Sequence, residues 1–311
     1  MKKLISIVFP TFNERDNLDE LSSRVNKIIN KINNYKFEVI FIDNSSNDGT
    51  IEKIKDLCKK NKNYKAIINT RNFGHLKSPY YAILQTDGDA TILLASDLQD
   101  PPEIIPKLIK KWQQGSDVVL TVKKTSHENK VMFKIRSLYY NLISFISDVT
   151  LIKNATGAGL FDKKIISVLK SINDNNPYFR GLLCELTSSI DTVEFDQPRR
   201  LSGITKNNFY SLFDLAMLGV TNHSRFPLRI MTLGGFLISL LSLITAISYI
   251  FLKIFYWSKY DLGTAPILIG VFFFGAIQAF FIGVLGEYIG SIHIRTRNLP
   301  LVVEKERINF R

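Results

Sequence analysis

The 311-residue sequence predicts an α/β domain followed by two helices that cross a membrane. Short apolar runs alternate with amphipathic helical patterns over the first 125 residues. This alternation is typical of a parallel sheet with helices on both faces. Near the carboxyl end, the stretches 230–252 and 262–286 contain no charged residue. Each is at least as long as the roughly 20 apolar residues that a membrane-spanning helix needs.

The elements of the α/β domain follow one another in a regular order. We expect strands at Leu4–Phe9, Phe37–Ile42, Ala66–Ile68, Thr91–Ala95 and Val118–Val122. We expect helices at Asn17–Ile32, Thr50–Lys60, Lys77–Thr86, Pro102–Gln113 and Glu128–Ile146, followed by a glycine-rich segment at 156–159. Because ligands of such sheets bind beyond the carboxyl ends of the strands, polar residues at these ends are the candidate site residues.

The two uncharged stretches have the composition of membrane spans. The first contains thirteen Ile, Leu and Phe residues, which give a gross insertion free energy of roughly −4 to −8 kcal/mol. The alternative is a pair of buried helices in a soluble protein. Such helices usually carry a polar stripe, and neither stretch has one. Before them, 208–220 has the pattern of an amphipathic helix that lies on the bilayer surface or packs on the core.

Basic residues predict the orientation of the spans. They flank the pair at Arg225, Arg229, Arg295 and Arg297, whereas the connecting loop has only Lys253, Lys259 and Asp261. The positive-inside rule therefore places both chain ends in the cytoplasm of a multi-pass inner (plasma) membrane protein. The apolar run Leu4–Phe9 stops at Pro10 and is too short for a signal peptide, which agrees with this orientation.

The net charge of +12 is typical of proteins that bind nucleic acid or an anionic membrane surface. Between Arg199 and Arg229 there are five basic residues and one acid, immediately before the first span. We therefore expect a membrane partner and no nucleic acid. The two cysteines, Cys58 and Cys184, indicate neither a disulfide framework nor a metal cluster.

Polar motifs follow the first, second and fourth predicted strands. The first motif is 9–14, in which we expect the chain to turn at Pro10 and to expose Asn13 and Glu14, unless these residues only cap the next helix. The second begins at Asp43, whose carboxylate can accept hydrogen bonds from a base or ribose, and continues into 48–50, a predicted turn and helix cap.

The third motif is 96–103, directly after the fourth predicted strand. A carboxylate with a nearby amide, here Asp97 and Gln99, suits a divalent cation that bridges diphosphate oxygens. The segment also reads as a helix entry, with Asp100 as the cap and two prolines in the first turn. Both interpretations can hold together.

These motifs, in this order, resemble family 2 glycosyltransferases of the GT-A fold, a Rossmann-like nucleotide-sugar-binding fold. Within that family the chain is similar to polyprenyl-phosphate sugar transferases of the dolichol-phosphate mannose synthase and bactoprenol glucosyltransferase types. The segments that carry the resemblance are 10–14, 43–50, 71–74, 97–103, 200–206, 227–229 and 283–290, so it spans nearly the whole chain.

The resemblance implies roles for individual residues. It places four residues in the nucleotide pocket: Pro10, Phe12, Glu14 and Asp43. It also implies that Asp97 and Gln99 help to hold a Mg²⁺ or Mn²⁺ ion that binds the donor diphosphate. It places Arg200 and Lys206 at the lipid phosphate, so that the catalytic residues are Asp97, Arg200 and Lys206. Lys123 occupies a position at which the family has an arginine, and the resemblance implies that it also contributes to binding of the donor or the lipid phosphate. Cations just before a membrane anchor are a physically sensible site for a lipid phosphate.

Two positions depart from the family pattern. Ala95 occupies the first position of the family's Asp-x-Asp pair, and 157–159 reads Gly-Ala-Gly where the lipid transferases have Asp-Phe-Arg. A phosphate nucleophile is already ionised at neutral pH and needs no general base. The loss of these acids is therefore compatible with transfer to a lipid phosphate, although it bears on metal affinity and donor choice.

The resemblance implies an inverting transferase that moves a hexose-type sugar from a nucleotide diphosphate, UDP by expectation, to polyprenyl (undecaprenyl) phosphate for envelope glycan modification. One alternative is a transferase that extends a lipid-linked oligosaccharide, and another is a catalytically degenerate membrane partner protein.

The chain is expected to have four segments. We expect a cytoplasmic catalytic domain over 1–206, an amphipathic juxtamembrane segment over 207–229, two spans with a short external loop over 230–293, and a cytoplasmic tail over 294–311. Gly283, Gly286 and Gly290 have the spacing of a close helix contact, which is compatible with a homo-oligomer.

Overall fold

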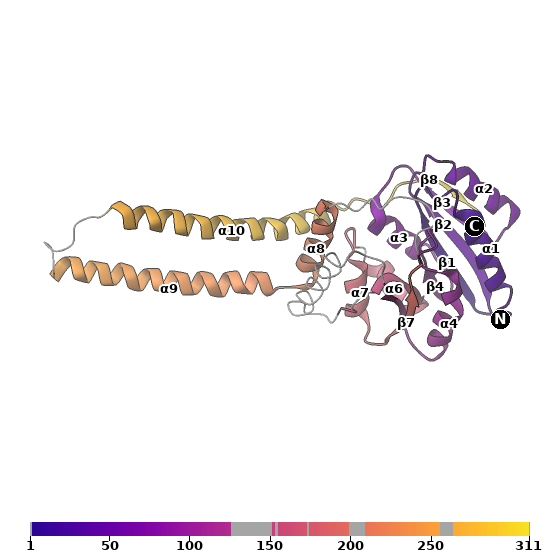
Figure 1. The fold of residues 1–311 in the computed structure, drawn as a ribbon, viewed down its shortest axis with the longest axis horizontal. Helices are drawn as coiled ribbons and strands as arrows, with labels where there is room; N and C mark the ends of the chain where they lie inside the picture. Colours follow the sequence, from indigo (N-terminus) through magenta and orange to yellow (C-terminus); the bar gives the residue numbers. More distant parts are fainter. Residues whose placement is uncertain are drawn as a thin grey trace.

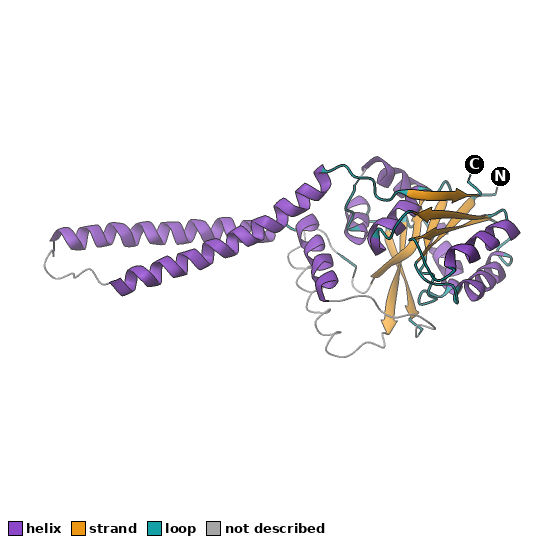
Figure 2. Cartoon of the chain, turned by 90° about the horizontal axis from the view of Figure 1, so that it is seen from above, coloured by secondary structure: helices purple, strands orange, loops and turns teal. Residues whose placement is uncertain are grey.

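A computed structural model of the chain describes residues 2–125, 151–152, 155–172, 174–198, 209–255 and 264–310. It contains a globular α/β domain and a pair of long helices that extends away from it (Figure 1). Both chain ends lie in the globular domain, as Figure 2 shows from above. The predicted helix 128–146 and the predicted site residues Arg200 and Lys206 lie outside the described residues.

Within the described residues, eight strands form one mixed sheet in the order β7-β5-β6-β4-β1-β2-β3-β8. Their bounds are Leu4–Thr11 (β1), Lys36–Asp43 (β2), Tyr64–Asn69 (β3), Ala90–Leu93 (β4), Val118–Thr125 (β5), Ala155–Asp162 (β6), Ile190–Asp196 (β7) and Glu304–Ile308 (β8). β1 is parallel to β2 and β4, and β2 is parallel to β3. β6 is antiparallel to both β4 and β5, and β8 is antiparallel to β3.

The five predicted strands are present as β1 to β5 and run in the same direction, as expected, but the sheet as a whole is mixed because β6 and β8 run antiparallel to their neighbours. The glycine-rich segment 156–159 belongs to a strand, β6, which inserts antiparallel between β4 and β5. The backbones approach closely there, because a Cβ on Gly159 would lie 2.2 Å from the Val119 carbonyl oxygen. A glycine inside a strand pattern is thus the mark of this contact.

β1 lies at the switch point of the sheet. From β1 the chain runs to β2 and β3 on one side, and it returns to β4 on the other. In open α/β sheets, the crevice beyond the carboxyl ends of the strands at such a point is the usual ligand site.

The predicted turn at Pro10 comes one residue too early, since β1 continues to Thr11. Val8 and Pro10 present their backbone groups towards β4: the Val8 carbonyl accepts from Leu94 N, and the Pro10 carbonyl accepts from Ser96 Oγ. Pairing with β4 ends at Leu93. The missing N–H of Pro10 therefore removes no ladder hydrogen bond, which is why proline is tolerated in this central strand.

Helices cover both faces of the sheet, as predicted. They are α1 Leu18–Ile29, α2 Thr50–Lys60, α3 Gly74–Leu84, α4 Ile105–Gln113 after the short 3₁₀ helix Pro102–Ile104, α6 Lys163–Ile172 and α7 Phe179–Leu186. α1, α2 and α4 pack on one face, and α3, α6 and α7 pack on the other.

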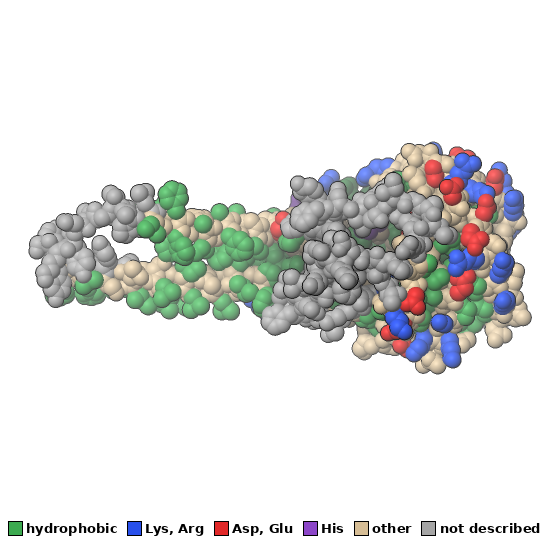
Figure 3. Space-filling view, viewed as in Figure 1, with side chains coloured by type: hydrophobic (Ala, Val, Ile, Leu, Met, Phe, Trp, Pro, Cys, Tyr) green, Lys and Arg blue, Asp and Glu red, His purple; other side chains and the backbone are tan. Residues whose placement is uncertain are grey.

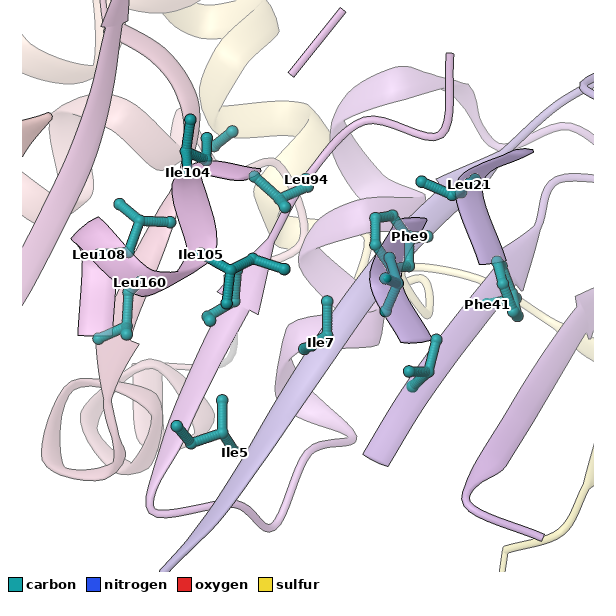
Figure 4. Close-up of a cluster of buried hydrophobic side chains, with 14 of the residues drawn as sticks. Ile5, Ile7, Phe9, Leu21, Phe41, Leu94, Ile104, Ile105, Leu108 and Leu160 are labelled. Atoms are coloured by element: carbon teal, nitrogen blue, oxygen red, sulfur yellow. The ribbon is translucent and has the colours of Figure 1, made fainter. Parts of the chain in front are cut away.

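Alternation along β1 builds the two cores. Ile5, Ile7 and Phe9 point to the face that α1, α2 and α4 cover, where Phe9 stacks on Phe41 with ring centroids 5.8 Å apart (Figure 4). Val8 points to the opposite core. Each of these four residues is fully buried, so both cores hold β1 in place and fix the position of its carboxyl end.

The helices that follow the globular domain are α8 Phe209–His223, α9 Phe226–Phe255 and α10 Thr264–Thr296. The segments Phe226–Leu252 and Ile269–Thr296 are long and apolar enough to cross a membrane. Their large side chains point outward, with Phe236 66% and Phe272 73% exposed, and green side chains cover the extended pair in Figure 3. A Cβ on Gly283, Gly286 or Gly290 would meet nothing within 4 Å, so the homo-oligomer stays a prediction.

A joint connects α8 and α10 to α7 of the globular domain. We call its residues Gly181, Glu185, His223, Ser224 and Tyr288 the α7–α8–α10 joint. His223 is 7% exposed, and its Nδ1 lies 2.6 Å from Glu185 Oε1. Tyr288 on α10 donates its hydroxyl to the Ser224 carbonyl at 2.8 Å. A Cβ on Gly181 would lie 2.2 Å from His223 Nε2, so only glycine fits beneath this ring.

The predicted tail over 294–311 ends as a strand of the sheet. β8 pairs antiparallel with β3 and covers its outer edge. Beyond it, Asn309 donates its Nδ2 to the Cys58 carbonyl at 2.9 Å and to the Tyr64 carbonyl at 2.7 Å. The tail therefore forms part of the globular domain, and the chain leaves and re-enters this domain on either side of the helix pair.

Candidate active site

The carboxyl ends of β1, β2 and β4 come together at one edge of the sheet. Ser96, after β4, donates its hydroxyl to the Pro10 carbonyl at 2.7 Å, and the Asn13 amide donates to Ser46 Oγ, after β2, at 2.8 Å. The three polar motifs therefore meet in space, as the strand order implies.

Asp43 closes β2 as a fully buried carboxylate. Its Oδ1 accepts from the Ser46 amide at 2.9 Å, and its Oδ2 accepts from Ser46 Oγ at 2.6 Å. Burial raises the pKa of Asp43, and the hydrogen bonds from Ser46 offset part of this rise. The structure thus places Asp43 at the predicted strand end, where it organises the loop between β2 and α2.

The motif after β1 forms a tight turn into α1. Asn13 adopts a left-handed conformation with φ 59°, and Glu14 Oε2 accepts from Asn17 Nδ2 at 2.6 Å. Pro10 and Phe12 are half-buried beside this turn. Glu14 thus braces the helix entry, and its predicted contact with a nucleotide stays a prediction.

The turn before α2 has the predicted structural role. Asp48 Oδ1 accepts from the Thr50 amide at 3.0 Å, and Gly49 has a φ of 91°. This conformation is one that glycine adopts at little energetic cost.

Asn44 links this edge to the loop after β3, a role that the sequence did not reveal. Its Oδ1 accepts from the Phe73 amide at 2.9 Å, and its Nδ2 donates to Asn72 Oδ1 at 2.8 Å. Asn69 also donates to Asn44 Oδ1 at 3.2 Å. The only available signal was the position of Asn44, directly after Asp43 at a strand end.

Two buried carboxylates follow β4. Asp97 and Asp100 are each 6% exposed. Asp97 Oδ1 accepts from the Gln99 amide at 3.1 Å, and Asp100 Oδ2 lies 3.4 Å from the amide nitrogen of Ala95. Between them, Leu98 takes a positive φ of 61°, which folds the segment back on itself. The prediction that Asp100 caps the helix is wrong, because its carboxylate turns back towards β4 and Pro101 holds the cap position.

Burial and neighbouring charges change the pKa of Asp100. The pKa of Asp100 is raised to about 6. Burial is the largest cause and the negative charge of Asp97 adds to the rise, whereas the hydrogen bond with the Ala95 amide and the positive charge of Lys123 lower the pKa. The structure therefore brings Lys123, at the end of β5, to the same site as the two acids. An additional positive charge here would favour the ionised form of Asp100.

The residues present fit a divalent cation that is bound together with a diphosphate. Within the described ranges, no group of three His, Cys, Asp or Glu side chains is arranged to hold a metal on its own. Mg²⁺ in nucleotide sites is, however, usually held by one or two carboxylates, with substrate phosphates and water as the other ligands. Asp97 and Asp100 supply two carboxylates, and half-buried Gln99 lies between them in the chain.

Comparison with known proteins gives a match over most of this domain and similarity over the whole chain. The model of glycosyl transferase family 2 matches residues 6–168. A bactoprenol glucosyl transferase of Shigella phage SfX is 32% identical, over 97% of this chain and 99% of its own length. A prophage bactoprenol glucosyl transferase homolog of Escherichia coli is also 32% identical, over 97% and 98%.

Among solved structures, residues 1–349 of Staphylococcus aureus TarS with UDP-GlcNAc share 18% identity with a TM-score of 0.44, over 72% of this chain and 67% of that fragment. Mannosyl-3-phosphoglycerate synthase of Rubrobacter xylanophilus shares 15% identity with a TM-score of 0.46, over 75% of each chain. The family match, together with the mixed α/β sheet, confirms the predicted glycosyltransferase class and its GT-A type of fold. The chain belongs to glycosyl transferase family 2.

Proposed function

We propose that this glycosyltransferase moves a hexose-type sugar from a UDP-linked donor to polyprenyl phosphate at the cytoplasmic face of the plasma membrane. The observation that carries the proposal is similarity along the full length, helix pair included, to proteins named bactoprenol glucosyl transferases. The sugar–lipid product would serve envelope glycan modification. Direct attack by the lipid phosphate on the anomeric carbon inverts its configuration.

The buried acids after β4 form the donor-phosphate side of the site. Asp97 and Gln99 would hold Mg²⁺ or Mn²⁺, with the Asp100 carboxylate beside them. When bound, the cation supplies positive charge that stabilises the departing nucleoside diphosphate. Without it, two ionised carboxylates would face the diphosphate and repel it.

The nucleotide binds, in this proposal, across the ends of β1 and β2. Pro10 and Phe12 offer half-buried apolar surface to the base, and Glu14 and Asp43 lie at the same edge as hydrogen-bond acceptors. The hydrogen bonds to Ser46 and Asn17 hold both carboxylates in fixed orientations, which lowers the entropy lost on binding.

The acceptor approaches from the membrane. Arg200 and Lys206 would meet the lipid phosphate, and Lys123 is already placed beside the acidic pair. The helix pair and the return of β8 to the sheet support an anchor that leaves the globular domain and both chain ends on one side of the bilayer.

The test is a transfer assay with membranes that contain the protein, undecaprenyl phosphate, Mg²⁺ or Mn²⁺ and a panel of nucleotide sugars. Lipid extracts are analysed by mass spectrometry. We expect one new hexosyl-phosphoryl-lipid ion, which names the donor. The Asp97→Ala variant should lose at least about 100-fold in rate, as is usual when a group that stabilises the transition state electrostatically is removed. The matched control is Asp56→Ala on exposed α2, which should keep full activity.

Three outcomes contradict parts of the proposal. Full activity of Asp97→Ala would remove the metal-site assignment. Labelling of a lipid-linked oligosaccharide with no labelled lipid monophosphate would identify a glycan-extending transferase instead. A protein that binds no nucleotide sugar at all would be a degenerate membrane partner.

A further inference from the structure

Gly157 in β6 lies at the same edge of the sheet as the acids after β4. The antiparallel register of β4 and β6 pairs Leu93 with Gly159, and the ladder ends there. On the other side, Thr156 Oγ1 lies 2.6 Å from Thr121 Oγ1 of β5. Gly157 therefore lies beyond the last residue pair of β4 and β6, on the side of the sheet where the acids after β4 lie.

An arginine from α7 occupies the space over Gly157. A Cβ at this glycine would lie 3.5 Å from Arg180 Cγ and 3.7 Å from Arg180 Cδ. The backbone of Gly157 has a φ of 87°, a conformation that an aspartate side chain would disfavour. At this point of the site, the chain thus presents the stem of a cation where the family resemblance implies an acid.

The surrounding contacts hold Arg180 in place. The preceding residue, Phe179, packs its ring on Phe161 at 5.1 Å and on Tyr80 at 5.7 Å, which fixes the start of α7 in the core. Arg180 Nη1 donates to the Ala155 carbonyl at 3.1 Å, and the guanidinium lies 5.7 Å from the centre of the Tyr178 ring. The side chain is half-buried, so part of it is open to solvent.

Arg180 acts on the ionisation of His75, at the start of α3. Desolvation lowers the pKa of His75, and the positive charge of Arg180 lowers it further. The imidazole at the start of α3 therefore lies within electrostatic range of the guanidinium. A planar, permanently charged guanidinium that is held in one orientation is the side chain best suited to bind two oxygens of a phosphate.

We propose that Arg180 binds a phosphate group at this edge of the sheet, between β6 and α7. The inference rests on the proposed function, in which both the donor and the acceptor carry phosphate. The shared chemistry is a phosphate monoanion or dianion, and its two sources are the nucleoside diphosphate and the lipid phosphate. In the family, acids at the positions of Ala95 and Gly157 would help to hold a metal ion that neutralises the phosphate charge. Arg180 compensates for their absence, because its guanidinium attracts the phosphate directly.

The experiment measures binding rather than turnover, with purified full-length protein in detergent. The ligands are UDP with Mn²⁺ in one arm and a short-chain polyprenyl phosphate in the other. The Arg180→Gln variant removes the charge, Arg180→Lys keeps the charge without the planar fork, and Arg307→Gln on β8 is the matched control at the far edge of the sheet. Thermal unfolding of each variant establishes that it is folded.

We expect Arg180→Gln to lower the affinity for one of the two ligands by about tenfold or more. The affinity of Arg180→Lys should lie between those of Arg180→Gln and the wild type, and Arg307→Gln should bind both ligands as the wild type does. Loss confined to the lipid phosphate assigns Arg180 to the acceptor, and loss confined to UDP assigns it to the donor. Equal binding of both ligands by wild type and a folded Arg180→Gln overturns this inference alone. Wild-type protein that binds neither ligand overturns the proposed function as well.

Discussion

Asp100 illustrates how much the environment of one side chain matters in this site. Its carboxylate is held away from water beside a second carboxylate, and its pKa rises from 3.8 to about 6. Between these two values the folded protein binds a proton that the unfolded chain has released. The contribution of Asp100 to the free energy of unfolding is therefore fully present below about pH 4 and is lost as the pH rises to about 6.

The Asp100→Asn variant tests this effect. The amide keeps an acceptor for the Ala95 N–H and removes the buried charge. We expect the variant to gain stability over the wild type as the pH rises from 4.5 to 7.5, by up to about 2 kcal/mol, because part of the effect is already present at pH 4.5. Thermal unfolding across this range without divalent cations measures the difference, and a difference that does not change with pH would contradict the prediction.

Gly181 is a residue at which any side chain would collide with another element. A Cβ there would lie 2.2 Å from His223 Nε2. We expect Gly181→Ala to destabilise the α7–α8–α10 joint by about 1–3 kcal/mol, as overpacked cores do. Adding His223→Ala should recover part of that loss, because the smaller side chain makes room for the new methyl group.

The matched control for this prediction is Gly234→Ala in α9, where a Cβ meets nothing within 4 Å. Gly234→Ala should not lower the melting temperature. Strict additivity of Gly181→Ala and His223→Ala in a double-mutant cycle would show that the two residues do not interact.

The sequence could predict part of the site, for a physical reason. Asp43 and Asp97 directly follow apolar strands, so their place at the carboxyl edge follows from topology alone. The role of Asp100 was hidden because the orientation of its carboxylate depends on the positive φ of Leu98. Arg180 comes from a helix that follows the sheet residues at a distance in sequence, and only packing brings it to Gly157.

At the level of elements, the same distinction separates the predicted strands from the missed ones. β1 to β4 are continuous apolar runs, because helices bury both of their faces. β7 is an edge strand in which only Val193 and Phe195 are buried, and β8 has the sequence Glu-Lys-Glu-Arg-Ile. Charged edge strands carry little hydrophobic signal, since their pairing comes from backbone hydrogen bonds.

β8 also makes a prediction about stability. Deletion of residues 304–311 would uncover the edge of β3 and remove both hydrogen bonds of Asn309. We expect a lower melting temperature and more aggregation in detergent, because an open strand edge pairs with other chains. Lys305→Ala, an exposed position on the same strand, is the control and should behave as the wild type. An unchanged melting temperature after deletion would show that β8 does not stabilise the sheet.

On the scale of the whole molecule, the helix pair leaves and re-enters one globular domain (Figures 1 and 2). If both helices cross the bilayer, the residues between them lie on the opposite side from β8. A cysteine at Lys259 should then react with a membrane-impermeant maleimide in intact cells, and a cysteine at Lys305 should react only after permeabilisation. The parent protein, with Cys58 and Cys184 in the globular domain, is the control. The reverse labelling pattern would contradict the proposed orientation.

The pairing of β3 with β8 has a consequence for how the protein is made. Thr70 and Val303, which join the two strands' ends, are 233 residues apart in the chain. During synthesis the outer edge of β3 therefore stays open until both long helices have left the ribosome. In a chain whose second helix failed to insert, the residues of β8 would remain on the opposite side of the bilayer from β3. The outer edge of β3 would then stay exposed to proteases and to other nascent chains. If both helices cross the bilayer, closure of the sheet therefore requires that both have inserted correctly.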